Sequence, residues 1–181
     1  RLTAGFTGAD IENILNESAI LAARDDRKII TMKDISEAVN KVMAGPAKKS
    51  RLVTESDKRI TAYHESGHAI VAKLMKHCDN VHEVSIIPRG MAAGYTITLP
   101  ENDDNHMTKG KLLDDIAMML GGRAAEELVI HDVSTGASND IQRASQLARK
   151  MVTEWGMSDS IGNMYLGSSE EVFLGRDYQT H

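Results

Sequence analysis

Residues 64–68 carry the sequence HESGH, and the rest of the chain is interpreted from this stretch outward. It lies inside a helical pattern that runs from Asp57 to His77. On a helix, His64 and His68 are one turn apart on the same face, where both imidazoles can bind a single Zn²⁺. Glu65 follows the first histidine directly, so its carboxylate can act as general base for a metal-activated water. The stretch predicts a catalytic zinc site.

The surroundings of the motif favour a metal over a chance match. His64 and His68 fall on the same helical stripe as three apolar residues, Ile60, Val71 and Met75, so both rings point toward the core. A buried imidazole without a partner costs free energy, and a shared metal ion would satisfy both rings. The alternative is a pair of ordinary helix-face histidines, since short motifs do occur by chance.

A catalytic zinc needs a third protein ligand and one open position. The compact pattern HExxHxxGxxH cannot supply it, because Val71 and Leu74 stand where that pattern requires Gly and His. The remaining candidates are carboxylates: Glu126 or Glu127 from a later helix, and Asp140 from the first turn of another helix. We expect Ser138 to cap that last helix, which leaves Asp140 free for another role. The residues alone place Asp140 only slightly ahead of Glu127.

The chain before the motif predicts a short helical hairpin and then a linker. Thr7 and Asp10 form a capping-box pattern ahead of a helix over 10–24. A second cap at Thr31 precedes a helix that ends near Gly45-Pro46. Residues 45–51, GPAKKSR, are polar and basic and contain a Gly-Pro pair, which is typical of a linker. We therefore place the domain boundary in a linker at 46–53.

The chain after the motif predicts a small antiparallel strand pair and further helices. Residues 81–88 and 94–99 are rich in β-branched residues. An exposed edge of the second strand can accept an extended substrate by strand addition. From Thr108 a long helical pattern follows, interrupted by Gly121 and Gly122, where we expect another segment to approach the backbone closely. The fold class is therefore mainly α with a small antiparallel β element.

Composition limits the classes of function. The 181 residues carry 21 Lys and Arg against 26 Asp and Glu, so the net charge of −5 argues against nucleic acid as a partner. No stretch approaches the roughly 18 consecutive apolar residues that span a bilayer. The single cysteine, Cys78, cannot close an internal disulfide. The chain reads as a piece of a longer protein.

Four motifs together closely resemble the FtsH family of membrane-anchored, ATP-dependent zinc proteases. They are AYHESGHAIV at 62–71, IIPRG at 86–90 followed by GYT at 94–96, GGRAAEE at 121–127 and STGASND at 134–140. The beginning of the chain, with FTGAD at 6–10 and NESA at 16–19, is similar to the end of the helical lid of that family's AAA+ module. The resemblance implies a lid remnant at 1–45, a linker at 46–53 and a C-terminally truncated zinc peptidase domain at 54–181.

By this resemblance His64, His68 and Asp140 match the zinc ligands, Glu65 matches the catalytic glutamate, and the glutamates of 121–127 support the site. The implied function is that of a zinc metalloendopeptidase that degrades unfolded or unneeded proteins for quality control. ATP and Mg²⁺ belong to an ATPase part absent from this chain. The implied parent is a homo-hexamer with polypeptide substrates. It is anchored in a bacterial inner membrane, with this domain in the cytoplasm, or alternatively in an organelle inner membrane.

Two other classes of function compete with the enzyme. One is a catalytically silent, zinc-containing scaffold for ring assembly or substrate engagement. Glu65 argues against it, because a structural zinc site needs no general base and usually has four protein ligands. The other is a nucleotide-binding module suggested by the lid-like residues, and the sequence holds no GxxxxGK[ST] phosphate loop to support it.

Overall fold

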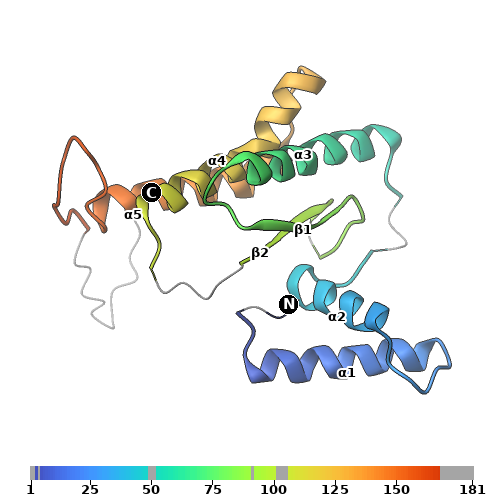
Figure 1. Cartoon of the computed structure of the whole chain (residues 1–181). Helices are drawn as coiled ribbons and strands as arrows, with labels where there is room; N and C mark the ends of the chain where they lie inside the picture. Colours follow the sequence, from blue (N-terminus) through green and yellow to red (C-terminus); the bar gives the residue numbers. More distant parts are fainter. Residues whose placement is uncertain (1–2, 4, 49–51, 91, 101–105, 168–181) are drawn as a thin grey trace, which may run out of the picture.

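The computed structural model describes residues 3, 5–48, 52–90, 92–100 and 106–167. A helical hairpin, α1 and α2, lies on one side of a small sheet, and the long helices α3 and α4 lie on the other (Figure 1). The mainly α fold with a small antiparallel β element is confirmed. Residues 168–181, the last part of the expected peptidase domain, lie outside the described residues.

The hairpin consists of α1 (Gly8–Arg24) and α2 (Met32–Ala44), as the cap signals predict. Thr7 caps α1: its backbone N–H donates to Asp10 at 2.8 Å, and its hydroxyl accepts from the Asp10 N–H at 3.3 Å. A small core of Ile14, Ala38 and Val39 joins the two helices. The hairpin is therefore assembled from local caps and one compact apolar contact.

Helix α3 (Glu55–Leu74) carries the HESGH stretch and ends three residues earlier than the pattern predicts. Met75 already has an extended backbone, with φ −74° and ψ 141°. Beyond it, the His77 N–H donates to a carboxylate oxygen of Asp114 at 2.9 Å. This contact with the next long helix turns the chain away from the axis of α3.

Strands β1 (Asn80–Ser85) and β2 (Tyr95–Leu99) pair antiparallel, with Ser85 opposite Tyr95 and a bulge between Val81 and Glu83. Strand β1 is shorter than predicted. After it the chain pairs with the residues that follow the hairpin, since the Lys48 N–H donates to the Pro88 carbonyl at 2.8 Å. The main chain of residues 88–90 thus pairs with the segment after α2.

Helix α4 (Lys109–Ala125) continues into a π-helical turn, η1 (Glu126–Ile130), and a short 3₁₀ turn, η2 (Thr135–Ala137), leads into α5 (Ser138–Thr153). The glycine pair 121–122 does not interrupt α4. The expected cap at Ser138 is wrong: the N-cap position is Ala137, without a side-chain cap bond, and Ser134 caps η2 by accepting from the Gly136 N–H.

The expected close approach to the glycines of α4 is confirmed. A Cβ on Gly67 would lie 2.3 Å from the Gly121 carbonyl oxygen, and one on Gly121 would lie 2.8 Å from the Gly67 oxygen. Neither atom could move away without shifting a helix backbone. Helices α3 and α4 therefore cross at a point that has room for glycine alone on both sides.

Five polar residues join the hairpin to the sheet, and we call them the polar joint: Glu37, Asn40, Glu83, Arg89 and Tyr95. The buried guanidinium of Arg89 donates to Glu37 at 2.7 Å and to the Tyr95 hydroxyl at 3.3 Å. Glu83 accepts from the Asn40 amide at 2.8 Å and from the Tyr95 hydroxyl at 2.6 Å. Strand β2 is thus anchored to α2 through side chains.

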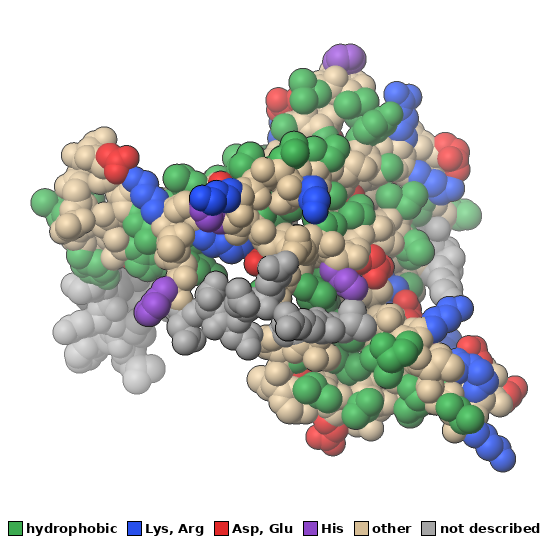
Figure 2. All heavy atoms as spheres, viewed as in Figure 1, with side chains coloured by type: hydrophobic (Ala, Val, Ile, Leu, Met, Phe, Trp, Pro, Cys, Tyr) green, Lys and Arg blue, Asp and Glu red, His purple; other side chains and the backbone are tan. Residues whose placement is uncertain are grey.

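Apolar side chains lie beside charged ones on the surface of the hairpin and on the surface of the part that contains α3, α4 and α5 (Figure 2). Among the described helices, none combines the length and the apolar character needed to cross a membrane.

Candidate metal centre

The two histidines of the HESGH stretch lie side by side on the buried face of α3. His64 is 8% exposed and His68 9%, and their Nε2 atoms are 3.1 Å apart. The ring planes stand at 83° to each other. The i, i+4 spacing has therefore brought both imidazoles to one point, as the motif predicts.

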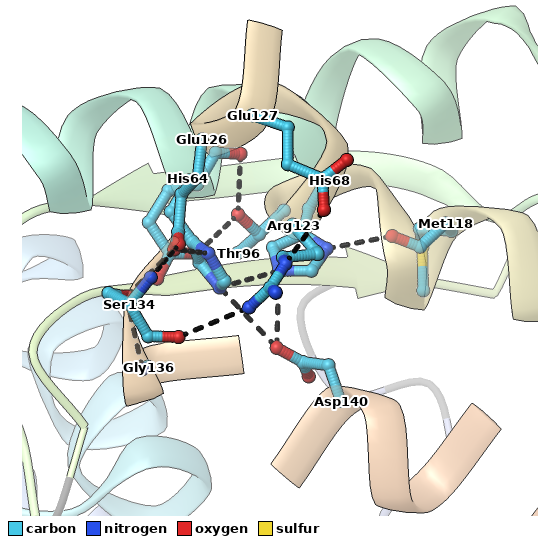
Figure 3. A network of polar contacts seen from close by, with 11 residues as sticks. His64, His68, Thr96, Met118, Arg123, Glu126, Glu127, Ser134, Gly136 and Asp140 are labelled. Carbon is cyan, nitrogen blue, oxygen red and sulfur yellow. Dashed lines mark hydrogen bonds and ion pairs between the residues drawn. The ribbon is translucent and has the colours of Figure 1, made fainter. Parts of the chain in front are cut away.

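Contacts on the far side of each ring determine which nitrogen faces that point. His64 Nδ1 lies 2.7 Å from Glu126 Oε1, and His68 Nδ1 lies 2.7 Å from the Met118 carbonyl oxygen (Figure 3). Both partners are acceptors, so each neutral ring carries its proton on Nδ1. The two Nε2 atoms then present lone pairs to each other.

Asp140, from the first turn of α5, completes the cluster. Its Oδ2 lies 3.4 Å from the Nε2 of His64 and 3.4 Å from that of His68. Four-coordinate Zn²⁺ with bonds of 2.0–2.1 Å separates its ligand atoms by about 3.3–3.4 Å. These three atoms form the metal-binding group found among the described residues, and their spacing and chemistry fit a zinc ion.

Gly122 of α4 forms one wall of this group. A Cβ there would lie 2.6 Å from His68 Nε2 and 2.7 Å from His64 Cε1. Any side chain at this position would push against the two rings. The glycine pair of α4 therefore serves two purposes, the helix crossing at Gly121 and the approach to the histidines at Gly122.

The charges of the cluster depend on one another. Burial opposes the charged form of His64, but hydrogen bonds to Asp140 and Glu126 outweigh it and raise the pKa of the ring. Burial also opposes ionisation of Asp140, yet the two rings, when they are protonated on Nε2 as well, donate hydrogen bonds that hold its pKa well below the usual range. The cluster thus attracts positive charge, which a proton or a metal ion can supply.

Glu65 lies beside the cluster and is 6% exposed. Burial raises the pKa of its carboxyl group, and a hydrogen bond from Thr96 opposes the rise. That bond runs from the Thr96 hydroxyl to Glu65 Oε2 at 2.8 Å. Glu65 contributes no atom to the three-ligand group, so its carboxylate is free to accept or donate a proton.

The two carboxylates that the sequence left open as ligands lie in different places. Glu126, 1% exposed, contacts His64 on the Nδ1 side and accepts from the Ser134 N–H at 2.8 Å. Glu127 is turned toward solvent, where it pairs with Arg123 at 3.0 Å. Glu126 thus orients a ring, and Glu127 lies away from the ligand atoms.

An open cleft runs past the cluster. Its lining comes from the end of α2, from α3, from β2, from α4 and from the start of α5, and its volume is about 1200 Å³. Apolar side chains such as Met43, Ile60 and Ile97 lie along it beside the polar cluster. A cleft of this kind has room for an extended peptide.

Three residues have contacts at the site that the sequence does not predict: Met118 through its carbonyl, Ser134 through its N–H and hydroxyl, and Thr96 through its hydroxyl. A backbone carbonyl carries no side-chain signal, so the Met118 contact could not be read from the chain. Ser134 belongs to a predicted loop and to the STGASND motif, and neither shows that its hydroxyl donates to Glu126 at 3.1 Å. Thr96 belongs to a predicted strand and to the GYT motif at 94–96, and neither shows that its hydroxyl reaches Glu65.

Comparisons with known proteins show two family models that match the chain. The model of peptidase family M41 matches residues 51–181, and the model of the AAA+ lid domain matches residues 1–37. Over 98% of its length the chain is 59% identical to a Thermoanaerobacter sp. (strain X514) protein named ATP-dependent zinc metalloprotease FtsH 1. It is 56% identical, again over 98%, to one from Alkaliphilus metalliredigens (strain QYMF) named ATP-dependent zinc metalloprotease FtsH 2. The chain spans 29% and 26% of the length of these two relatives.

Proposed function

The chain belongs to peptidase family M41, and from this premise we propose that residues 54–181 form the zinc endopeptidase domain of an ATP-dependent protease. The observation that carries the proposal is the convergence of three ligand atoms, with separations of 3.1, 3.4 and 3.4 Å, beside a buried glutamate. The relatives' printed names support the same reaction class.

His64, His68 and Asp140 would hold the zinc ion, the two rings through Nε2 and the aspartate through Oδ2. When bound, Zn²⁺ acts as a Lewis acid toward water and the peptide carbonyl. Glu65 accepts the proton of the attacking water and returns it to the leaving amine. Glu126 and the Met118 carbonyl keep the Nδ1 protons in place, so the Nε2 lone pairs stay directed at the metal.

The substrate is an extended stretch of polypeptide that lies in the cleft along β2. Among the described residues, β2 pairs with β1 on one edge only. The other edge can accept main-chain hydrogen bonds from a peptide, which gives affinity with little dependence on side-chain identity. This mode of binding suits a protease that removes many different unfolded proteins.

The hairpin belongs with the ATP-dependent part of the whole protein. We propose a lid segment at 1–45, a linker at 46–53 and the peptidase domain after it, with ATP and Mg²⁺ bound by the ATPase part. Assembly into a homo-hexamer and anchoring in a bacterial inner membrane, with the peptidase domain on the cytoplasmic side, belong to the same proposal. The match of residues 1–37 to the AAA+ lid model supports the lid segment and the ATP-dependent part of this proposal.

The test is metal content by elemental analysis together with cleavage of unfolded casein, which needs no prior unfolding. We expect about one zinc per chain in both the unmodified protein and Glu65→Gln, with cleavage in the unmodified protein alone. Glu127→Gln is the matched control, because its carboxylate is exposed and lies away from the ligand atoms. Full cleavage by Glu65→Gln would overturn the proposal, and zinc without cleavage in any form would favour a silent scaffold.

A further inference from the structure

Thr96 of strand β2 lies close to both the carboxylate and the main-chain carbonyl of Glu65. The Thr96 hydroxyl lies 2.8 Å from Glu65 Oε2 and 3.1 Å from the Glu65 carbonyl oxygen. Just before the strand, Gly94 packs so closely that a Cβ there would lie 3.0 Å from Glu65 Cγ and 2.6 Å from Thr61 Cγ2. The side chain of Glu65 is thus touched along its length by one short segment.

The Thr96 hydroxyl supplies the hydrogen bond that holds the Glu65 carboxylate. Among the described residues, Thr96 is the only side chain that donates a hydrogen bond to the Glu65 carboxylate. A glutamate side chain has three rotatable bonds, and burial by itself does not select one rotamer. The hydroxyl comes from a β-branched residue on a paired strand, so its own direction is narrowly defined.

We propose that Thr96 is a positioning residue for Glu65. This proposal rests on the proposed function of Glu65 as general base. The hydroxyl holds Oε2 and leaves the other carboxylate oxygen, Oε1, for proton transfer. Gly94 allows the segment to approach closely enough for this bond to form. Strand β2, which we propose to bind the substrate, therefore also orients the Glu65 carboxylate. One strand thus holds the peptide and the general base in a fixed position relative to each other.

The rest of β2 is anchored well enough to serve this purpose. Tyr95 and Ile97 alternate with Thr96 along the strand and are buried on its other face. The Tyr95 hydroxyl is held by Glu83 and Arg89 of the polar joint. The pairing of β2 with β1 and the polar joint together thus fix the position of the Thr96 hydroxyl.

The test is steady-state kinetics of a short fluorogenic peptide with Thr96→Val and Thr96→Ser, in the zinc-loaded protein. Valine keeps the shape of threonine and removes the hydroxyl, whereas serine keeps the hydroxyl. We expect Thr96→Val to lower kcat by about 10- to 100-fold with KM within about twofold, as for a misplaced catalytic group. Thr96→Ser should stay within about threefold of the unmodified protein in kcat.

Two further readouts separate positioning from a structural role. Zinc content and the thermal unfolding midpoint should be unchanged in Thr96→Val. A crystal structure of that variant should show the Glu65 carboxylate moved from its place near residue 96. The control is Thr153→Val at the end of α5, which also deletes a hydroxyl bonded to a carbonyl oxygen and should leave kcat unchanged.

Unchanged kcat in Thr96→Val, or loss of zinc in it, would overturn the inference. Equal losses in Thr96→Ser and Thr96→Val would also overturn it, because the hydroxyl would then not be the active feature. Glu65→Gln in the same assay keeps the two proposals apart. If that variant cleaves the peptide normally, the proposed function fails; if it is inactive while Thr96→Val is normal, only the role of Thr96 fails.

Discussion

The hairpin and the metal centre are held together over very different distances along the chain. In the hairpin the capping contacts join residues three apart, and the Arg27–Asp34 ion pair spans seven. In the metal centre His68 meets Met118 fifty residues away, and His64 meets Glu126 sixty-two residues away. The first region is therefore built from local signals, and the second exists only once α3, α4 and α5 are packed.

The two regions should therefore be destabilised by different kinds of substitution. A hairpin of local contacts should respond to changes in its caps and its small core. The metal centre should lose zinc affinity after any substitution that moves α3, α4 and α5 apart, even at a residue that supplies no ligand atom. We expect four changes to separate the two regions.

Gly67→Ala should have the largest effect, because its Cβ would lie 2.3 Å from the Gly121 carbonyl oxygen. Forcing α3 and α4 apart should cost about 3 kcal/mol of stability, the upper end of ordinary overpacking. Chemical denaturation measures this, and zinc affinity should fall with it. Gly8→Ala in the hairpin is the control, since nothing lies within 4 Å of that site. A stable, zinc-binding Gly67→Ala variant would contradict the tight crossing.

Glu126→Gln should weaken zinc binding by about 10- to 100-fold, the usual effect of losing a carboxylate partner of a histidine ligand. The amide cannot replace the charged acceptor at His64 Nδ1. Competition with a chelator of known affinity measures the change. Glu127→Gln should bind zinc normally, because Glu127 contacts Arg123 at the surface. Equal losses in the two variants would show that general charge matters and that orientation of the ring does not.

Arg89→Leu should loosen the contact between the hairpin and the sheet, at a cost of about 1–3 kcal/mol for the unsatisfied partners. Arg89 is buried, and it bonds Glu37, Tyr95 and the Gly45 carbonyl. Hydrogen exchange should increase at the end of α2 and in β2, while the α3–α4 crossing stays protected. The idea of a polar joint fails if exchange rises equally throughout the molecule.

The pH dependence of the hairpin should be the smallest effect. Hydrogen bonds from Arg27 and Thr31 hold the pKa of Asp34 well below its usual range. Because the folded pKa is below the unfolded value of about 3.9, the contribution of Asp34 is complete above about pH 5. It is lost as the pH falls through the lowered folded pKa. Hydrogen exchange of α1 and α2 between pH 6 and pH 2 should show this loss, and Asp34→Asn should remove most of the dependence.

Much of the fold could be predicted because its signals are local. The caps at Thr7 and Thr31, the antiparallel pair and the helix that carries His64 all follow from nearby residues. The errors occur where a distant contact overrides the local pattern. Helix α3 ends early because His77 bonds Asp114, and β1 ends early because Pro88 bonds Lys48.

The candidate site was predictable in part for the same reason. The i, i+4 histidines and the adjacent Glu65 form a local pattern, and their placement on one face of α3 follows from helix geometry. The choice between Glu126, Glu127 and Asp140 as third ligand could not be made from residue type, since all three are carboxylates on helices. It depends on which helix face turns toward the rings.

Helix periodicity and side-chain type act within a few residues, so the chain alone specifies the helices, the strand pair and the chemistry available at residues 64, 65 and 68. Only the tertiary structure decided that Asp140 faces both Nε2 atoms, that Glu126 faces His64 Nδ1 and that Thr96 reaches Glu65. These three groups come from α5, from the turn after α4 and from β2, all distant in the chain from α3, so only packing can bring them together. The close crossing at Gly67 and Gly121 sets the position of α4, and with it that of Glu126 in the turn that continues the helix.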